Sequence, residues 1–227
     1  MGRLIDPERR KRARQESERR RAEILVQARS CFLEQPFSEV TLEVVARRAG
    51  TKAGFASMYF VDREHLALGL LREELAGWFT ALEAALGRPT GRRRSLPRLA
   101  AVVGRTLVGR PLLLRLLEAM PTLLEVGLPA TEVFTLLSWQ RDRLQAPGRV
   151  LERAVPALGP GGGVRVLVEL QLQVAAVQLL ATPRGSLAVA LADPQLAWLR
   201  RDLEVELVAW LAGRLAACGA SSANRLK

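Results

Sequence analysis

Apolar residues recur at every third or fourth position through most of the 227-residue chain, and this spacing is its strongest constraint on the fold. Such a spacing places the apolar side chains on one face of an α-helix. Strand signals are scarce, because the chain has no Asn-Gly or Asp-Gly hairpin dipeptide and aromatic residues make up only 5%. The sequence therefore predicts an all-α fold.

Caps and breakers divide this pattern into separate helices. Thr41 and Asp62 are N-cap residues in sequence, and Gly50 is suited to close a short helix. The charged segment 87–94 has no apolar periodicity and predicts a loop between two lobes, while the glycines of 159–163 predict a flexible linker. Helices are expected at residues 17–34, 42–49, 53–60, 63–86, 96–108, 111–126, 130–155, 164–181 and 194–217.

The first 21 residues differ from the rest of the chain. They hold nine basic and four acidic residues and almost nothing apolar, so they cannot bury a core. We expect a disordered arm that runs into the first helix. The predicted parts are a basic flexible arm (1–21), a helix-turn-helix domain (22–75), a larger helical bundle (76–218) and a disordered tail (219–227).

The net charge is strongly positive, at +11 from 34 basic and 23 acidic residues. Such a balance favours an anionic partner: nucleic acid, a phosphorylated ligand or an anionic membrane surface. Only three of the basic residues are lysines, and a GC-rich coding genome also produces abundant arginine. The excess does not lie in residues 22–80, which hold six basic and eight acidic residues. The charge alone therefore does not locate a binding site.

Several classes of function lack the residues that they need. The chain has one histidine, His65, and two distant cysteines, Cys31 and Cys218. We therefore expect no metal site, no cofactor and no catalytic residues. His65 is expected at the surface or in a helix cap. Cys31 is expected in the apolar core, with a redox-sensing thiol as the alternative. No signal peptide and no uncharged apolar run of about 20 residues is present, so a cytoplasmic location is expected.

Residues 41–60 carry the most specific pattern, two short helices joined by a glycine-containing turn. Ala46 is small enough for the two helices to approach closely. Gly50 adopts a positive φ at the turn without steric cost. Val45 and Ala49 are expected to face inward. The N-terminal part of the second helix would then face a DNA major groove.

This segment resembles the DNA-binding domain of the TetR family of bacterial transcriptional repressors, over roughly residues 22–75. The resemblance is carried by Thr41, Val45-Ala46, Ala49-Gly50, Gly54, Tyr59-Phe60 and Asp62-Arg63-Glu64 followed by Leu66. It implies that Thr41 caps its helix and touches a phosphate, that Lys52 begins the recognition helix, and that Arg63 contacts a phosphate. The other positions that it implies at the DNA are Ala53, Gly54, Phe55, Ser57 and Met58, with Arg19, Arg20 and Arg21 before the first helix.

The recognition helix departs from the family pattern. Ser57 replaces the first tyrosine, Met58 stands at a commonly polar position, and Ala56 occupies a position that is usually larger and apolar. Few hydrogen-bond donors remain for base edges. Phe55 and Met58 are suited to contact thymine methyl groups. In the alternative, Phe55 turns into the core and fills the space that Ala56 leaves.

The resemblance also implies roles for the C-terminal domain, which dimerises and holds an effector pocket in this family. The apolar lining predicts an apolar or amphipathic small-molecule ligand, whose binding would release a dimeric repressor from a palindromic operator. The predicted pocket residues are Leu116, Met120, Leu123, Leu124, Phe134, Leu137, Gln140 and Gln173, with Glu118 and Trp139 as further candidates. The predicted dimer residues are Val166, Leu170, Val174, Val177, Leu203, Leu207, Trp210 and Leu211, with intramolecular core as the alternative for each.

Two other classes of function are an enzyme and a protein that binds a membrane surface or a protein partner. An enzyme built on a helical bundle would need catalytic groups that the chain lacks. A non-enzymatic protein that binds an anionic membrane surface or a protein partner through the basic arm is the other alternative. That arm lacks the large apolar residues needed to insert into a bilayer, so we expect no membrane partner.

Overall fold

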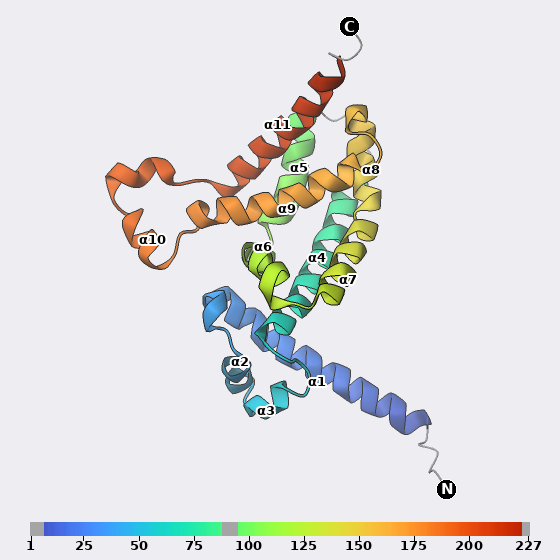
Figure 1. Cartoon of the computed structure of the whole chain (residues 1–227), viewed down its shortest axis with the longest axis vertical. Coiled ribbons are helices and arrows are strands. Elements are labelled where there is room, and N and C mark those ends of the chain that lie inside the picture. Colours follow the sequence, from blue (N-terminus) through green and yellow to red (C-terminus); the bar gives the residue numbers. More distant parts are fainter. Residues whose placement is uncertain (1–6, 88–94, 224–227) are drawn as a thin grey trace. The chain divides into compact units, whose positions relative to one another are not determined.

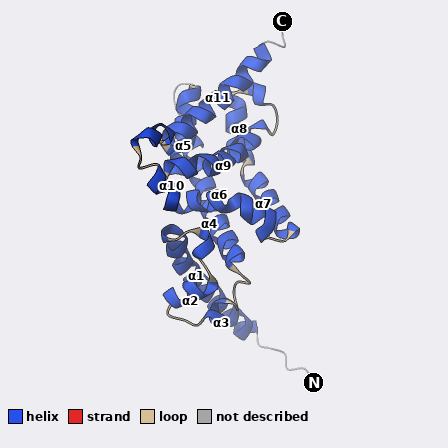
Figure 2. Ribbon diagram, turned by 60° about the vertical axis from the view of Figure 1, so that its left-hand side comes forward, coloured by secondary structure: helices blue, strands red, loops and turns tan. Residues whose placement is uncertain are grey.

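A computed structural model describes residues 7–87 and 95–223 of the chain. Over these ranges the chain folds into helices and connecting loops without a strand (Figure 2), which confirms the predicted all-α class. The predicted loop at 88–94 and the last four residues of the predicted tail lie outside the described residues.

The chain divides into two compact units between Leu70 and Leu71. The division falls inside helix α4 (Arg63–Gly87), a few residues before the predicted boundary after residue 75. Gly69 lies beside the division and does not end the helix, and α4 contributes buried residues to both units, among them Leu66 and Leu75. A boundary inside a continuous helix leaves no local signal in the sequence.

The first unit consists of short helices packed on one long helix (Figure 1). Its core contains the predicted apolar stripe of the first helix, from Ile24 to Phe32, together with Val45, Phe60 and Leu66. Its elements are α1 (Pro7–Glu34), η1 (Phe37–Glu39), α2 (Leu42–Arg48), α3 (Ala53–Ala56) and the start of α4.

Helix α1 begins at Pro7 and not near residue 17, so the prediction of a disordered arm up to residue 21 is wrong for its described part. Residues 8–19 are exposed, and alanine is their only apolar residue type. Ion pairs one turn apart hold the segment together, with Arg14 to Glu18 at 3.0 Å and Arg20 to Glu16 at 2.8 Å. Such pairs stabilise a helix in water without an apolar face.

The second unit packs its helices around α9, which contacts α6, α8 and α11, while α5 lies beside α11 (Figure 1). Its elements after α4 are α5 (Leu96–Val108), α6 (Pro111–Thr122), η2 (Leu123–Gly127), α7 (Ala130–Arg143), α8 (Gln145–Ala154), η3 (Pro156–Leu158), α9 (Gly162–Ala181), α10 (Gly185–Ala190), η4 (Pro194–Leu199) and α11 (Leu203–Ala223).

Two predicted helices are divided by prolines. The helix expected at 111–126 changes after Thr122 into one turn of π-helix, because Pro121 has no N–H to continue the α-helical ladder. The helix expected at 130–155 breaks at Leu144, since Pro147 cannot donate to the carbonyl of Arg143. The expected helices continued through both prolines.

The connection between α9 and α11 contains more structure than predicted. The helix expected at 194–217 is a 3-10 helix up to Leu199 followed by α11, which starts after Asp202 caps the backbone N–H of Val205 at 2.9 Å. Helix α11 continues to Ala223, so the tail predicted to be disordered from residue 219 is helical up to that residue. Alanine and serine continue the helix past Gly219.

Helix α9 is, within the described residues, a helix long and apolar enough to span a membrane by length and composition. Its contacts with α6, α8 and α11 and its buried stripe identify it as the central core helix of the second unit.

Candidate nucleic-acid interface

Thr41 fixes the start of α2 as predicted. Its hydroxyl oxygen accepts a hydrogen bond from the backbone N–H of Val44 at 3.2 Å. This bond satisfies one of the N–H groups that the first turn of a helix leaves unpaired. The side chain is half-buried, so its oxygen also lies at the surface of the first unit.

The turn between α2 and α3 has the predicted geometry. Gly50 has a φ of +66°, where a side chain would be strained. The backbone N–H of Thr51 donates to the carbonyl of Ala46 at 2.9 Å, which closes the end of α2. Val45 and Ala46 are fully buried beneath the turn. The two helices therefore form a helix-turn-helix arrangement.

The recognition segment is a single helical turn, and the expected helix to residue 60 is shorter than predicted. Helix α3 ends at Ala56, where Met58 donates to the carbonyl of Phe55 and Tyr59 donates to that of Ala56. These bonds span three residues, a tighter winding than the α-helix, because the wholly buried Ala56 and Phe60 draw the chain back to the core.

Four of the predicted DNA-facing residues share the exposed surface of this segment. They are Lys52, Gly54, Ser57 and Met58, and the Met58 side chain is 74% exposed. Ala53 is the first residue of α3. Arg47, in the last turn of α2, is also exposed, and the sequence analysis did not select it. Arg47 could have been predicted from the sequence, because it is a basic residue in the last turn before Gly50.

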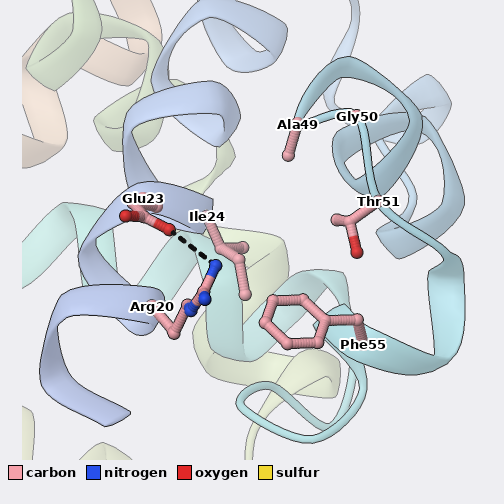
Figure 3. A pocket seen from close by; sticks show the side chains of 7 residues that line it. All are labelled: Arg20, Glu23, Ile24, Ala49, Gly50, Thr51 and Phe55. Atoms are coloured by element: carbon pink, nitrogen blue, oxygen red, sulfur yellow. Dashed lines mark ion pairs between the residues drawn. The ribbon is translucent and has the colours of Figure 1, made fainter. Parts of the chain in front are cut away.

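Phe55 lies neither on the exposed DNA-facing surface nor in the core, the two positions expected for it. Its ring is half-buried, lies 5.4 Å from the ring of Tyr59 in an edge-on arrangement, and has the guanidinium of Arg20 at 5.8 Å from its centroid. Of Phe55 and Ala56, only Ala56 is buried in the core. The Phe55 ring points toward Ile24 of α1 (Figure 3), so it is turned away from a role in reading thymine methyl groups.

A cavity of about 310 Å³ separates Phe55 from the turn. The ion pair of Arg20 and Glu23, at 3.6 Å, forms one wall, as Figure 3 shows. The cavity explains why Phe55 is only half-buried, since its ring does not fill the space between α1 and the turn. The lining residues are Arg20, Glu23, Ile24, Ala49, Gly50, Thr51 and Phe55.

The arginines expected to contact phosphates already have partners in the protein. Arg19 and Arg20 pair with glutamates of α1, and the guanidinium of Arg21 lies 4.9 Å from the ring centroid of Phe60. Arg63 donates to the Ser38 carbonyl at 3.0 Å and pairs with Glu64 at 2.8 Å. These contacts orient the guanidinium groups, and a phosphate contact there stays a prediction.

Two polar contacts hold α1 and the start of α4 in place. Arg48 forms two hydrogen bonds with Glu34, at 2.6 and 2.7 Å, which join α2 to α1 and lower the pKa of the Glu34 carboxyl. Asp62 accepts from the backbone N–H of His65 at 2.8 Å and from its ring Nδ1 at 2.6 Å. The predicted capping position of His65 is therefore confirmed.

Cys31 lies in the core of the first unit, as expected. Its side chain is wholly buried, and this burial raises the pKa of the thiol. A buried and protonated thiol reacts slowly, so the alternative of a redox sensor at Cys31 does not fit its position. No group of three His, Cys, Asp or Glu side chains in the described ranges is placed to hold a metal ion.

The predicted effector residues of the second unit separate into two groups. Leu116, Met120 and Leu123 are buried, and Leu124 and Gln173 are half-buried. Phe134 and Leu137 are 73% and 44% exposed, so the prediction that they line an interior pocket is wrong in this structure. They lie on the solvent side of α7, whose buried side contains Leu136 and Gln140. Helical spacing could not distinguish the two sides, because both are apolar.

Most of the predicted dimer residues lie in the core of a single chain, which was the alternative to a dimer interface for each residue. Four of them on α9 and two on α11 are buried within the second unit, so they cannot meet a second copy. Leu203 and Trp210 are half-buried. The six buried residues are Val166, Leu170, Val174, Val177, Leu207 and Leu211. Because α9 packs against three helices, its most apolar face points inward, and the neighbouring face carries the exposed Leu172 and Leu179.

Three buried glutamines in the second unit have amide atoms without a hydrogen-bond partner. The atoms are Nε2 of Gln140, Oε1 of Gln171 and Oε1 of Gln178. A buried polar atom without a partner costs about 1–3 kcal/mol, so each needs an explanation. Only Gln140 was predicted to contact a ligand. Gln171 and Gln178 were not predicted, because the residues around them in sequence are mainly apolar.

Comparisons with known proteins agree with this arrangement. Residues 24–70 match the family described as bacterial regulatory proteins, tetR family, and residues 72–216 match the tetracyclin repressor-like C-terminal domain. The comparison with curated proteins finds no match.

Solved structures resemble the chain at low sequence identity. The fatty acid degradation regulator FadR of Bacillus halodurans is 13% identical with a TM-score of 0.53, covering 86% of this chain and 93% of that one. SmeT, the repressor of a Stenotrophomonas maltophilia multidrug efflux pump, is 21% identical with a TM-score of 0.47 and coverages of 86% and 89%. NalD of Pseudomonas aeruginosa is 21% identical with a TM-score of 0.42 and coverages of 87% and 95%.

The two family matches adjoin each other and together extend over most of the chain. The first includes the helix-turn-helix, and the second includes the helices packed around α9. The chain therefore belongs to the TetR family of bacterial regulatory proteins and is a DNA-binding transcriptional regulator.

Proposed function

We propose that this protein is a cytosolic, dimeric repressor that leaves its operator when a small molecule binds to the second unit. The observation that carries the proposal is the helix-turn-helix itself, in which Lys52, Ser57 and Met58 are exposed at the two ends of α3. A helix-turn-helix reads DNA with its second helix, and Lys52 directly precedes that helix while Ser57 and Met58 directly follow it.

Each exposed residue has a distinct role in this proposal. Lys52 contacts a phosphate, and Gly54 lets the backbone approach the groove closely. The Ser57 hydroxyl hydrogen-bonds a base edge or a phosphate, and the Met58 side chain packs against a thymine methyl group. Thr41 and Arg47 add contacts to the DNA backbone. Because so few donors are present, sequence preference depends on Ser57, Met58 and the shape of the duplex.

A second copy of the chain is proposed to pack on the exposed apolar side of α9 and α11. Leu172 and Leu179 of α9 are 50% and 55% exposed, and Val205 of α11 is 64% exposed. The ion pair of Arg214 with Glu169, at 2.8 Å, joins the two helices. A two-fold dimer places two recognition helices on half-sites about one DNA turn apart, which a palindromic operator provides.

The effector is proposed to bind among α6, α7 and α9, where Leu116, Met120 and Leu123 supply an apolar surface. Binding favours a conformation in which the two recognition helices no longer match the half-site spacing. A ligand shifts this balance only by its difference in affinity for the two conformations. The continuous helix α4, which belongs to both units, is the segment that passes the change between them.

The test is a selection of bound sequences from random DNA duplexes with the full chain at two salt concentrations. We expect a palindromic sequence whose affinity falls steeply as salt increases. Lys52→Ala and Ser57→Ala should weaken binding and leave dimerisation intact. Recovery of no preferred sequence, or loss of the dimer in these two variants, would contradict the proposal.

A further inference from the structure

The buried amides of the second unit suggest the chemistry of the effector. Among the described residues, the three glutamines on α7 and α9 are the buried polar or charged residues, with exposures of 2%, 0% and 4% for Gln140, Gln171 and Gln178. Each has one amide atom without a hydrogen-bond partner. They therefore form a set of unpaired hydrogen-bonding groups in an otherwise apolar interior.

The neighbouring helices offer these amides no partner. Helix α9 packs against α6, α8 and α11, whose buried residues are apolar or glycine. The other buried residues of α9 itself are valine, leucine and glycine. A buried water needs two to four polar partners, and these faces supply the amides alone. A ligand that brings its own polar groups would satisfy them.

The orientation of Gln171 follows from a contact. Its Nε2 donates to the carbonyl of Leu167 at 3.5 Å, which leaves its Oε1 as the unpaired acceptor. Gln178 also presents an unpaired Oε1, and Gln140 presents an unpaired Nε2. The interior therefore offers two acceptors on α9 and one donor on α7.

The two acceptors lie on the same side of α9. Gln171 and Gln178 are seven residues apart, which is about two helical turns or roughly 10 Å along the axis. One small polar group cannot reach both oxygens. A ligand that satisfies both carries a hydrogen-bond donor near each end and lies along the helix.

Two guanidinium groups lie against one carboxylate at α6. On α6, Arg115 lies 3.8 Å from Glu118, and Arg184 lies 3.1 Å from the same carboxylate. The side chains of Arg115 and Glu118 are 11% and 30% exposed, so they lie at the border of the apolar interior, and this partial burial raises the pKa of Glu118. No buried charge of the described chain would compensate an ionised ligand, whose desolvation would then be unfavourable.

We propose that the effector is a neutral, mainly apolar molecule with two hydrogen-bond donors roughly 10 Å apart, which donate to Gln171 and Gln178. This inference rests on the proposed function, because it describes the ligand that releases the repressor. It excludes dicarboxylates and other anions as the ligand class, despite the positive charge of the chain.

Thermal unfolding of the full chain with three probes of equal carbon number tests this chemistry. The probes are 1,8-octanediol, 1-octanol and octanedioate. We expect 1,8-octanediol to raise Tm with increasing concentration, 1-octanol to raise it less, and octanedioate to leave it unchanged. An equal or larger rise with octanedioate, or no rise with the diol up to its solubility, would overturn the proposal.

Substitution by methionine, which has a similar volume and no amide, tests the assigned residues. Gln171→Met and Gln178→Met should each raise Tm without a probe, because an unpaired acceptor is removed, and should abolish the rise with 1,8-octanediol. Gln195→Met, at an exposed glutamine, is the matched control and should retain the rise. A rise that persists in both buried-site variants, or lower Tm values without a probe, would refute the assignment.

A DNA-binding assay separates this inference from the proposed function. If the chain selects an operator, 1,8-octanediol should weaken operator binding in the wild type and not in the double variant Gln171→Met, Gln178→Met. If the chain selects no operator but the melting results hold, the ligand site stands and the proposed function fails. If it selects an operator but the melting results fail, the proposed function stands and this inference is overturned.

Discussion

Gly163 of α9 lies against the backbone carbonyl of Gly148 in α8, so that a Cβ at position 163 would overlap the main chain of α8. A Cβ at position 148 would lie 2.9 Å from the backbone nitrogen of Val164. The two helices can therefore cross at this distance only with glycine at both positions. This crossing also fixes α9 against the helix that precedes it.

The first prediction is that Gly163→Ala destabilises the second unit by about 1–3 kcal/mol, because backbone atoms cannot move aside as a side chain can. Chemical denaturation followed by circular dichroism measures the change. Gly87→Ala is the control, since a Cβ there meets nothing within 4 Å, and it should not destabilise the chain. Equal stability of Gly163→Ala and the wild type would show that α8 and α9 are not packed this closely.

Loss of the Thr41 cap should weaken the first unit and its DNA binding together. Thr41→Ala removes the hydrogen bond to the Val44 N–H and should cost about 1 kcal/mol of stability. Thr41→Ser keeps the hydroxyl and should behave like the wild type in both thermal unfolding and operator affinity. If the serine variant is as impaired as the alanine variant, the methyl group and not the hydroxyl stabilises the start of α2.

The contact of Arg48 with Glu34 predicts a pH dependence of stability. The hydrogen bonds lower the pKa of Glu34 in the folded chain. The ionised carboxylate therefore stabilises the folded chain at pH values above the ordinary pKa of a glutamate. This stabilisation is lost as the pH falls through that ordinary pKa and then through the lower pKa of the folded chain. Both side chains are largely exposed, so the effect is modest.

Glu34→Gln should therefore lower Tm by a few degrees at neutral pH. The difference from the wild type should close in acid, where the wild-type carboxyl is also protonated. Thermal unfolding at a series of pH values measures this difference. A difference that stays constant down to strongly acidic pH would mean that the ion pair does not contribute.

The two thiols should differ in reactivity. Cys31 is wholly buried, whereas Cys218 is half-exposed with the Arg214 guanidinium 2.7 Å from its Sγ. A short pulse of iodoacetamide followed by peptide mapping should label Cys218 in the folded chain and Cys31 only after unfolding. Cys218→Ser, which should show almost no labelling when folded, is the control. Equal labelling of both thiols in the folded wild type would contradict the buried position of Cys31.

A charged residue on the exposed side of α9 should separate the proposed dimer. Leu172→Glu should raise the dimer dissociation constant roughly tenfold or more, because a carboxylate would lie in an apolar interface. Sedimentation equilibrium measures the constant. Val126→Glu, at an 83% exposed residue of another element, is the matched control. Dimers that are equally strong in both variants would place the interface elsewhere.

The helix-turn-helix was predictable because each of its parts has a local signature. Thr41 caps the start of α2, Gly50 adopts a positive φ at the turn, and Val45 and Ala46 are buried as expected. The position of the Phe55 ring was not predictable, since it depends on Arg20 and Ile24, which lie on another helix. Local patterns identify the element, and distant contacts decide where its side chains point.

The second unit shows the limit of apolar periodicity more clearly. The α5 helix was predicted with its observed ends, Leu96 and Val108, from the apolar spacing of its residues. The side of α9 that faces the core was not distinguished from the side that faces solvent, because Val174 and Leu172 are both aliphatic. Only the packing of three other helices on α9 makes that choice.

The helical form of residues 7–21 changes how their positive charge reaches DNA. A disordered arm samples many positions and loses this freedom when it binds. From Pro7 to Arg20 the helix instead extends for about 20 Å as a stiff rod, with Arg9, Arg10, Lys11, Arg12 and Arg14 at fixed angles around its axis. In the proposed complex with DNA, such a helix would favour one direction and one phase of the phosphate chain, whereas a disordered segment of the same composition would not.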